Sequence, residues 1–501
     1  MPILPRLVAV FAAVLLVAAC TGEPTPPASG DPEGTSLVIG VADEPESLDP
    51  LRGYAPLGAA KVFDGLVEHD PVRALRPVLA AELPGPSSDG RSWTVRLRDD
   101  VSFSDGSAFD SADVVATYRA LLVDSAPLRS RFWMLAGVEA IDKTTVRFDL
   151  TRPYAAFADL LVLGVRSESD IRADPAEPPV GTGPYQVAEW VKGERLVLAA
   201  NQAYFAGAPA ITKVTVEFVP DDEVRAQRMR EGKLDGTELP ARLATGFAGV
   251  NGLAVVEHSS AGLLAVSLPD GPVTGDPAVR LALNLAVDRE ALVERALGGR
   301  GAPTSLPVPS ALAEFVEPGA AIKPDLARAR EVLDAAGWAA GGDGVRSKGD
   351  TLAAFEIGYP VADVTARDLV AAFAQAAREI GVTITAAPTP RGSAAQGPRL
   401  VAFGDPVDPD LSLYPLLHPA GGDLAAALDA ARATTDPAQR AAAFRALQRA
   451  YASAPTMVVL AAPTHSYVMR ENWTGYEPVV DATGADHTWG AWWNLQRWAP
   501  R

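Results

Sequence analysis

Helix patterns and strand patterns alternate along residues 276–386, and this alternation constrains the fold more than any other feature of the chain. Apolar residues recur at helical spacing after Asp276 and again in residues 365–380. Between and after these helices, residues 355–359 and 382–386 form short apolar runs that are typical of buried strands. Strands and helices that alternate at this spacing build a largely parallel sheet with helices packed on it. An α/β domain is therefore predicted here.

The earlier part of the chain carries further strand signals. Residues 36–41 (SLVIGV) are apolar and β-branched, which predicts a buried first strand. Residues 186–191 and 195–199 flank a Lys-Gly-Glu turn and predict a hairpin, and residues 213–219 predict another strand. Residues 59–67 show a helical pattern, so we expect a helix there.

Two short motifs indicate local structure rather than chemistry. Asp110 stands immediately before a helical run. Asp113 comes three residues after Asp110, which is the spacing of a capping box. Residues 181–185 (GTGPY) contain a Gly-Thr-Gly that could suggest a phosphate loop. No Lys-Ser/Thr pair follows it, and it leads into a strand rather than a helix, so a phosphate site is not expected.

The N-terminus has the layout of a secretory signal. A basic start is followed by the apolar residues 7–19, a run shorter than the ~20 residues that span a membrane. The sequence Val17-Ala18-Ala19-Cys20 resembles the cleavage box of bacterial lipoproteins, in which the Cys thiol receives the lipid. We expect a signal peptide over residues 1–19, lipidation at Cys20 and a Pro-rich tether to residue 35; an ordinary signal peptide with a buried Cys20 is the alternative.

Composition excludes several classes of protein. At roughly 150 residues per domain, 501 residues predict about three domains. The net charge of −18 is spread along the chain, and therefore nucleic acid is not expected as a partner. A single Cys excludes a disulfide scaffold and Cys-based metal sites. No stretch after residue 19 reaches 18 uncharged apolar residues, which favours a folded body outside the cytoplasm, held at the membrane by its lipid.

Catalysis is not expected. The five histidines form no HExxH or other metal-ligand spacing, and the chain contains no GxSxG nucleophile motif. They are His69, His258, His418, His465 and His487. We therefore predict a protein that is not an enzyme and carries no cofactor and no metal.

Several segments, taken in order, resemble family 5 of the bacterial extracellular solute-binding proteins, which feed peptide and nickel ABC importers. The similar segments are residues 46–50 (ESLDP), residues 103–114 (FSDGSAFDSADV), residues 181–185 with Trp190, Gly193, Asn201, Tyr204 and Gly207, and residues 276–289 (DPAVRLALNLAVDR). The resemblance extends from about residue 36 to the C-terminus.

The resemblance implies a two-lobed periplasmic-binding-protein type II fold with an extra inserted domain and a ligand cleft between the lobes. The implied domains are lobe I, over residues 36–71, 181–272 and 473–501; inserted domain II, over residues 72–180; and lobe II, over residues 273–472. Such lobes close on a ligand, and the closed form is what a transporter recognises.

The acidic residues 404–410 (GDPVDPD) resemble the family segment whose first Asp accepts the amino terminus of a bound peptide. By position that residue is Asp405. A carboxylate enclosed in a closed cleft is costly unless a cation neutralises it, so Asp405 would select amines. The alternative is an exposed turn of Asp and Pro without a ligand.

Aromatic residues stand where the family presents ligand contacts, although core packing is an equal alternative for each. They are Tyr54, Phe132, Trp133, Phe403 and Tyr476.

Two departures from the family pattern bear on specificity. Dipeptide-binding relatives place an Arg near the turn that matches residues 358–361, and here there is none. Ala402, beside Phe403, replaces the family's Trp, and Arg367 and Arg391 are alternative cations nearby. A strict dipeptide specificity is therefore not expected.

The function predicted from the resemblance is the substrate-binding lipoprotein of an ABC importer. It would capture an oligopeptide, a dipeptide or a related amine-bearing solute as a monomer and deliver it to the membrane permease and ATPase. The alternatives are a non-peptide ligand such as a nickel chelate or oligosaccharide, or a signalling or scaffold lipoprotein that no longer takes part in transport.

Overall fold

The computed structural model describes residues 36–55, 61–171, 178–342, 344–390, 397–481 and 489–501. Cys20, Arg391 and His487 lie outside these residues, so the expected signal peptide, lipidation site and tether are not described. The described residues belong to one compact unit, Gly34–Arg501.

Twelve strands of the described residues form one sheet in two halves, with the order β19-β18-β20-β13-β21-β11-β1-β10-β9-β8; β12 and β14 also pair with β21. The first half contains β1 (Ser36–Val41), β8 (Tyr185–Val191), β9 (Arg195–Ala200), β10 (Lys213–Phe218), β11 (Gly236–Leu239) and β12 (Leu253–Ser259). The second half contains β13 (Leu263–Ser267), β14 (Gly301–Pro303), β18 (Ala354–Pro360), β19 (Thr383–Thr389) and β20 (Arg399–Phe403).

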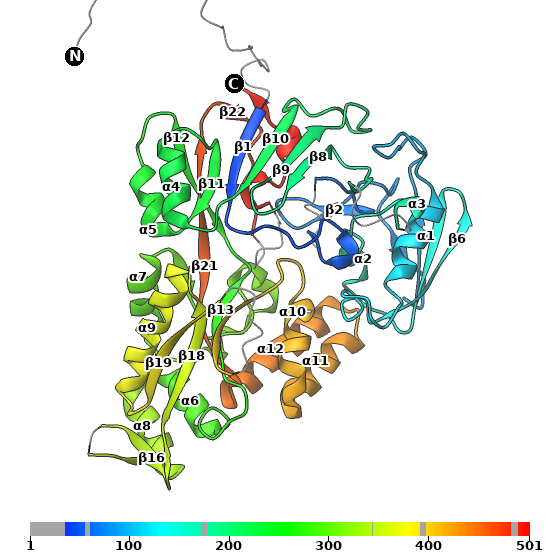
Figure 1. Ribbon diagram of the computed structural model, residues 1–501. Coiled ribbons are helices and arrows are strands. Elements are labelled where there is room, and N and C mark those ends of the chain that lie inside the picture. Colours follow the sequence, from blue (N-terminus) through cyan, green and yellow to red (C-terminus); the bar gives the residue numbers. More distant parts are fainter. Residues whose placement is uncertain (1–35, 56–60, 172–177, 343, 391–396, 482–488) are drawn as a thin grey trace, which may run out of the picture. The chain divides into compact units, whose positions relative to one another are not determined.

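The long strand β21 (Met457–Arg470) joins the two halves (Figure 1). Its first residues pair with β13 and β14, and its last residues pair with β11 and β12. In chain order this is the second crossing between the halves; the first lies between β12 and β13, at residues 260–262. Strand pairing alone would thus divide the chain after β12 and within β21. The domain boundaries expected from the sequence remain predictions.

Helices pack on both halves of the sheet, and those of the second half agree with the helical patterns after Asp276 and in residues 365–380. The helices on the two halves are α4 (Asp222–Arg230), α5 (Ala241–Ala244), α6 (Pro277–Ala286), α7 (Arg289–Leu297), α8 (Leu326–Ala335) and α9 (Val364–Arg378). In α9 the residues Leu369, Val370, Phe373 and Ala377 lie on one face and are buried in the core of the second half. Strands β18 and β19 run parallel on either side of α9 in sequence, which confirms the α/β prediction.

The segment that we call the inserted segment, residues 72–180, forms its own sheet with the order β4-β5-β7-β6. Its elements are β3 (Leu75–Pro77), which pairs with β2 (Val67–His69), β4 (Gly85–Pro86), β5 (Ser92–Arg96), β6 (Leu135–Asp142), β7 (Thr145–Leu150), α1 (Ser111–Ala120), α2 (Phe157–Leu160) and α3 (Glu168–Ile171). The expected capping box at the start of α1 is present. The Asp110 side chain accepts the backbone N–H of Asp113, and the Asp113 side chain accepts the backbone N–H of Asp110.

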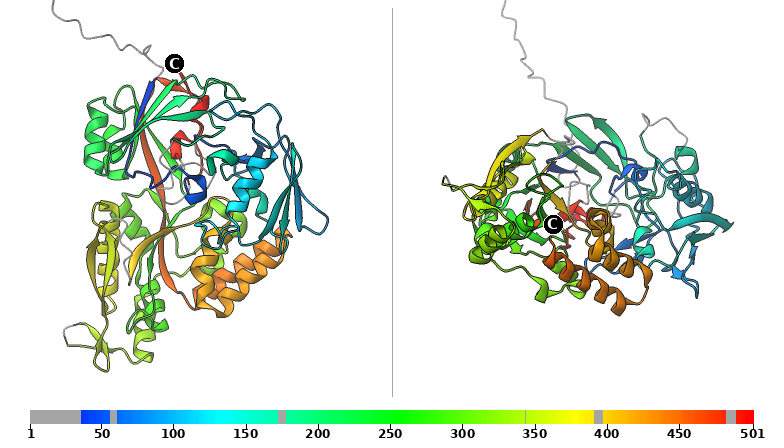
Figure 2. Two further views of the ribbon diagram at one scale, coloured as in Figure 1. Left: turned by 45° about the vertical axis from the view of Figure 1, so that its right-hand side comes forward. Right: turned by 90° about the horizontal axis from the view of Figure 1, so that it is seen from below.

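Three further helices, α10 (Pro409–Leu417), α11 (Gly422–Ala433) and α12 (Pro437–Ser453), surround a separate core cluster with Phe444, Leu447 and Tyr451. The remaining short strands are β15 (Ala339–Ala340), β16 (Arg346–Lys348), β17 (Thr351–Leu352), β22 (Trp473–Thr474) and β23 (Ala499–Pro500). Figure 2 shows α10–α12, in orange, beside the blue and cyan inserted segment, as Figure 1 does.

The helix expected over residues 59–67 is wrong for the residues that the structure describes. Residues 61–66 are irregular, and Val67 begins β2. The apolar side chains there are buried on more than one side, and Gly65 packs directly on the backbone of Val162. Burial on several sides gives a run of apolar residues without a helix.

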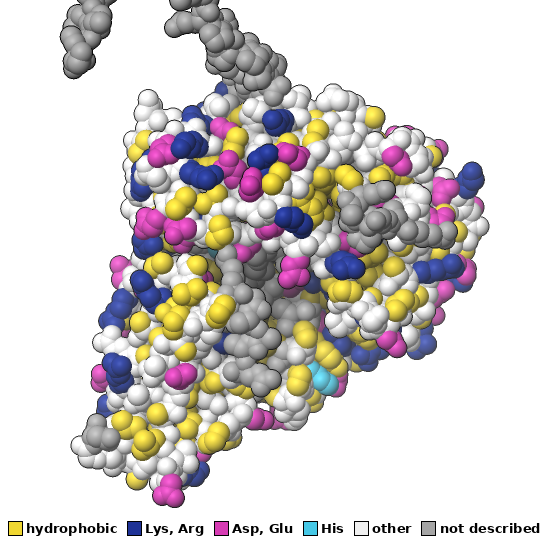
Figure 3. All heavy atoms as spheres, viewed as in Figure 1, with side chains coloured by type: hydrophobic (Ala, Val, Ile, Leu, Met, Phe, Trp, Pro, Cys, Tyr) yellow, Lys and Arg dark blue, Asp and Glu magenta, His cyan; other side chains and the backbone are white. Residues whose placement is uncertain are grey.

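Acidic and basic side chains are interspersed over the face shown in Figure 3. On this face the charged side chains form no single patch of one sign, in agreement with a net charge of −18 that is spread along the chain.

Candidate functional site

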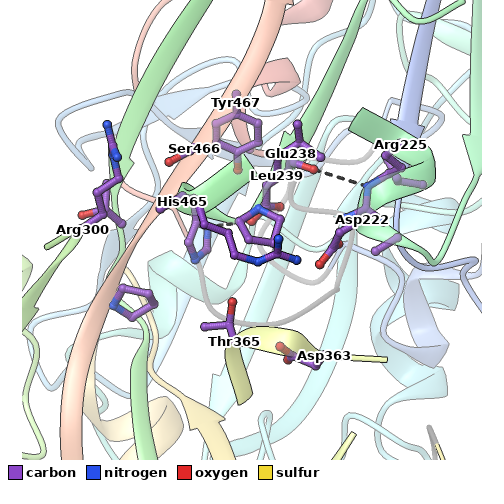
Figure 4. A pocket seen from close by; sticks show the side chains of 18 of the residues that line it. Asp222, Arg225, Glu238, Leu239, Arg300, Asp363, Thr365, His465, Ser466 and Tyr467 are labelled. Atoms are coloured by element: carbon purple, nitrogen blue, oxygen red, sulfur yellow. Dashed lines mark hydrogen bonds and ion pairs between the residues drawn. The ribbon is translucent and has the colours of Figure 1, made fainter. Parts of the chain in front are cut away.

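A cavity of about 520 Å³ is lined by residues from both halves of the large sheet (Figure 4). On the first half it lies at the carboxyl ends of β1, β10 and β11, which are parallel strands. On the second half it lies at the end of α7 and at the start of α9. Ligands of open α/β sheets bind outside the carboxyl ends of the strands, and sites for small molecules commonly measure ~300–1,000 Å³. The cavity therefore has the place and the size of a ligand site.

Charged side chains of both signs line this cavity. They are Asp43, Asp222, Glu238, Asp363, Asp368, Arg225, Arg242, Arg295, Arg300 and His465. Arg225 is buried; it donates to the carbonyl oxygens of Val219 (2.6 Å) and Glu238 (3.4 Å), and it pairs with Asp222. The guanidinium thus holds the ends of β10 and β11 together and uses three of its N–H groups on the protein itself.

His465 lies on β21 where the strand passes from one half of the sheet to the other. Its Nδ1 lies 3.1 Å from the Asp481 carboxylate and 3.9 Å from that of Glu238. Burial opposes the charged ring, but the Glu238 and Asp481 carboxylates outweigh it and raise the pKa of His465 to about 9. The cavity wall therefore contains an imidazolium at neutral pH. Figure 4 shows it on the opposite side of the cavity from Thr365 and Asp363.

Asp481 connects both segments that cross between the halves of the sheet. Its backbone N–H donates to Ser259 and its carbonyl accepts from Ala261, which places it against the first crossing segment. Its carboxylate accepts the Tyr467 hydroxyl at 2.7 Å and faces Nδ1 of His258 at 3.1 Å. Burial would raise the pKa of this carboxyl, but hydrogen bonds from His258 and His465 hold it below its usual range. We call His258, His465, Tyr467, Tyr476 and Asp481 the crossing cluster.

Asp405 is buried, with 4% of its side chain exposed, and it is not among the residues that line the cavity. One carboxylate oxygen accepts the backbone N–H groups of Val407 and Asp408. The other accepts from the Arg131 guanidinium at 3.1 Å. The exposure expected for Asp405 under the alternative is therefore wrong, because this carboxylate is enclosed and paired with a cation, whereas its contact with a ligand stays a prediction.

The next two carboxylates of residues 404–410 are also paired with arginines. Asp408 accepts from Arg440 on α12, and Asp410 accepts from Arg432 on α11 at 2.9 Å. The Tyr154 hydroxyl also donates to Asp410, at 2.8 Å. Each arginine lies far from its aspartate in the sequence, so no local pattern could have identified these partners.

Trp133 and Phe132 follow Arg131, the partner of Asp405, in the sequence, but their surroundings differ. Trp133 is partly buried, with the guanidinium groups of Arg152 and Arg432 each 4.4 Å from its ring centroid. Phe132 is 1% exposed and belongs to the core of the inserted segment, where it packs on Tyr118. Trp133 is thus at the contact with α11, whereas Phe132 is a core residue.

The other predicted aromatic residues lie elsewhere. Tyr54 is buried in the core of the first half, together with the C-terminal tryptophans. Tyr476 stacks on His258, and its hydroxyl lies 2.7 Å from the Nε2 of that histidine. Phe403 ends β20 opposite Leu263 and packs against the core of α10–α12. Tyr54 and Tyr476 therefore share the core of the first half, whereas Asp405, Trp133, Phe132 and Phe403 lie outside that core. The ligand roles of all six residues remain predictions.

Arg367 pairs with Asp368 on an exposed face of α9, in agreement with a helix-face position. Among the described residues, no group of His, Cys, Asp and Glu is arranged to hold a metal ion. None of the helices in the described part of the chain is long and apolar enough to cross a membrane.

A family model described as bacterial extracellular solute-binding proteins, family 5 middle, matches residues 74–423. Protein XP55 of Streptomyces lividans is 38% identical over 498 residues, which cover 93% of this chain and 91% of that protein.

Two solved structures are similar over 93% of this chain and 99% of their own chains. They are NikZ from Campylobacter jejuni in complex with Ni(L-His), with a TM-score of 0.85 and 24% identity, and the oligopeptide-binding protein AppA from Bacillus subtilis in complex with a nonapeptide, with a TM-score of 0.83 and 20% identity. At these identities the likeness shows the fold, and it confirms the two-lobed α/β architecture predicted from the sequence.

Proposed function

The chain belongs to the bacterial extracellular solute-binding proteins of family 5, and we propose that it captures peptides or related amine-bearing solutes for an ABC importer. The observation that carries this proposal is the cavity of about 520 Å³ at the carboxyl ends of strands from a two-lobed fold. Charges of both signs on its wall suit a ligand that is itself zwitterionic, as a free peptide is.

Asp405 is our candidate for the group that recognises the ligand's amine. Its carboxylate is enclosed and holds a cation, the Arg131 guanidinium, so a ligand ammonium group of the same charge would have to take the place of that guanidinium. Trp133, Phe403 and Tyr476, which are partly buried, are proposed as lesser contacts around the ligand, and Tyr54 and Phe132, which are buried in cores, as residues that support those contacts from behind. We propose no catalytic role, since the family and the fold are those of binding proteins.

The proposed receptor is exported, lipidated at Cys20 and held at the outer side of the cell membrane, where it delivers its ligand to a permease and its ATPase. Replacing the thiol tests the anchor. Cys20→Ser should release the protein from membranes into the detergent-poor phase of a partition experiment, with loss of the lipid mass in mass spectrometry. Equal partition of both proteins would contradict the anchor.

The function itself is tested by titration of the purified protein, followed by tryptophan fluorescence. A pool of tripeptides with free amino termini should change the emission in a saturable manner, and Asp405→Ala should weaken that binding at least about tenfold, the loss expected for a buried charge contact. Nickel–histidine chelate and maltotriose are the comparison ligands. Saturation by either of these without any response to peptides would overturn the peptide assignment, and unchanged peptide affinity in Asp405→Ala would remove Asp405 from the site.

A further inference from the structure

The three carboxylates of residues 404–410 differ in where their arginine partners originate. Asp408 pairs with Arg440 on α12, and Asp410 pairs with Arg432 on α11, two helices that share a core with α10. Asp405 instead pairs with Arg131, which belongs to the inserted segment and is 274 residues away in the sequence. Asp405 is therefore the one of these three aspartates whose arginine comes from the inserted segment rather than from α11 or α12.

Arg131 comes to Asp405 as part of a wider contact between the inserted segment and the acidic residues. The Tyr154 hydroxyl reaches Asp410 at 2.8 Å, and the Arg73 guanidinium donates to the Pro406 carbonyl at 3.3 Å. Both ribbon views show α10 and α11 beside the inserted segment (Figures 1 and 2). If the inserted segment moved away from these helices, Asp405 would lose its arginine while Asp408 and Asp410 would keep theirs.

The Asp405 carboxylate has little capacity left for a ligand in this arrangement. A carboxylate offers about four acceptor positions. Two backbone N–H groups occupy one of its oxygens and Arg131 occupies the other, and only 4% of the side chain is exposed. A ligand ammonium group would also be repelled by the guanidinium at the same carboxylate. A cationic ligand can therefore reach Asp405 only after Arg131 has left.

We propose that Arg131 is a built-in competitor for Asp405, and that it sets the specificity of the site by excluding cationic ligands too weak to displace it. This inference rests on the proposed function, because it assumes that Asp405 receives the ligand's amine. A competing internal group lowers the apparent affinity by the fraction of time that it occupies the site. Removing Arg131 should accordingly tighten binding of amine-bearing ligands and broaden their range.

The first test does not depend on the natural ligand. In Arg131→Ala, the Asp405 carboxylate is left without its guanidinium, and millimolar methylguanidinium is the probe that can replace it. We expect methylguanidinium to raise the melting temperature of this variant by about 2 °C, as saturating ligands do for a protein of this size. The wild type and the double variant Arg131→Ala/Asp405→Asn should show no rise. A rise of equal size in all three proteins, or in none, would overturn the inference.

The second test measures competition directly. Arg131→Gln should bind the pool of free tripeptides about tenfold more tightly than the wild type, and the same pool after N-acetylation should bind both proteins equally. Arg131→Lys, which keeps the charge, should stay near the wild type. Arg129→Gln is the matched control, because it removes the same charge two residues from Arg131. The Arg129 guanidinium donates to the Phe132 carbonyl and not to Asp405.

The two tests separate failure of the inference from failure of the proposed function. Peptide binding by the wild type without tightening in Arg131→Gln overturns the competitor role and leaves the receptor function intact. Absence of peptide binding in every protein overturns the peptide function, and the competitor role with it. The melting temperatures of Arg131→Gln and Arg131→Lys serve as the folding control. Cooperative melting of both variants shows that an altered affinity does not come from an unfolded protein.

Discussion

At the scale of single residues, the Gly-Thr-Gly of residues 181–183 is a motif that the fold requires although no phosphate site is expected there. A Cβ on Gly181 would lie 1.9 Å from the carbonyl oxygen of Val62, and one on Gly183 would lie 2.5 Å from that of Lys61. The backbone N–H of Gly183 also donates to Val62. The glycines therefore permit two backbones to touch, which explains the motif without a phosphate.

Gly181→Ala is expected to destabilise the protein by about 3 kcal/mol, because the rigid backbone of Val62 has to move to admit the methyl group. Urea denaturation followed by circular dichroism measures the effect. Gly246→Ala is the control, since a Cβ at that position would meet no atom within 4 Å, and it should change the free energy of unfolding by less than about 0.5 kcal/mol. Equal stability of the two variants would contradict the packing role of Gly181.

At the scale of elements, caps and periodicity were predicted correctly where they act locally. The α1 capping box is an example: Asp110 accepts the N–H of Ala112 at 2.8 Å, and Asp113 accepts that of Asp110 at 2.9 Å. Strand β21 is a contrasting example. Its apolar residues indicate a buried strand, but no local signal shows that its two ends pair in different halves of the sheet.

Asp110→Ala should lower the free energy of unfolding by about 1 kcal/mol, because it leaves a helix N–H group without its acceptor and breaks the reciprocal bond to Asp113. The measurement is again urea denaturation. Asp124→Ala removes the same charge from an exposed position beyond the end of α1 and should leave stability unchanged. If both substitutions have the same effect, the loss of charge rather than the cap is responsible.

At the scale of the whole molecule, the crossing cluster lies where the chain passes between the two halves of the sheet. Asp481 binds the first crossing segment through its backbone and faces the second, on β21, through its carboxylate. The cluster thus couples the two segments about which the lobes of such a fold move. Its electrostatics should therefore affect the stability of the whole chain rather than of one element.

The cluster predicts a dependence of stability on pH. The pKa of His465 is raised from 6.5 to about 9 on folding, so the folded chain holds this proton more tightly than the unfolded chain. The resulting stabilisation is complete below pH 6.5 and is lost as the pH rises through about 9. The contribution of His465 to the free energy of unfolding, measured in urea, should therefore fall between pH 7 and pH 9.5, whereas Lys61, whose pKa burial lowers to about 7, contributes in the opposite direction over this range.

His465→Gln should reduce this decline, because the titrating ring between Glu238 and Asp481 is gone. His418→Gln is the matched control: that ring is partly exposed, stacks on Tyr414 and takes no part in the crossing cluster. It should keep the pH profile of the wild type. A profile for His465→Gln that matches the wild type would show that another group titrates in this range.

The sequence by itself determined the features that depend on near neighbours. The periodicity of residues 365–380 placed α9, the Asp110 cap placed the start of α1, and the strand patterns placed β1, β9, β10 and β19. The same local reasoning was wrong at residues 61–66, where burial on several sides gives an apolar run without helical structure. The order of family-like segments was also enough to predict the two-lobed fold, which the comparisons confirm.

Only the tertiary structure decided which charges meet. Asp405 could be singled out from residues 404–410, but its pairing with Arg131 joins positions 274 residues apart. Likewise, the partners of His465 come from β11 and from a segment near the C-terminus. The physical reason is that backbone propensity and capping are fixed within a few residues, whereas the energy of a buried charge depends on whatever folding brings within a few ångströms of it.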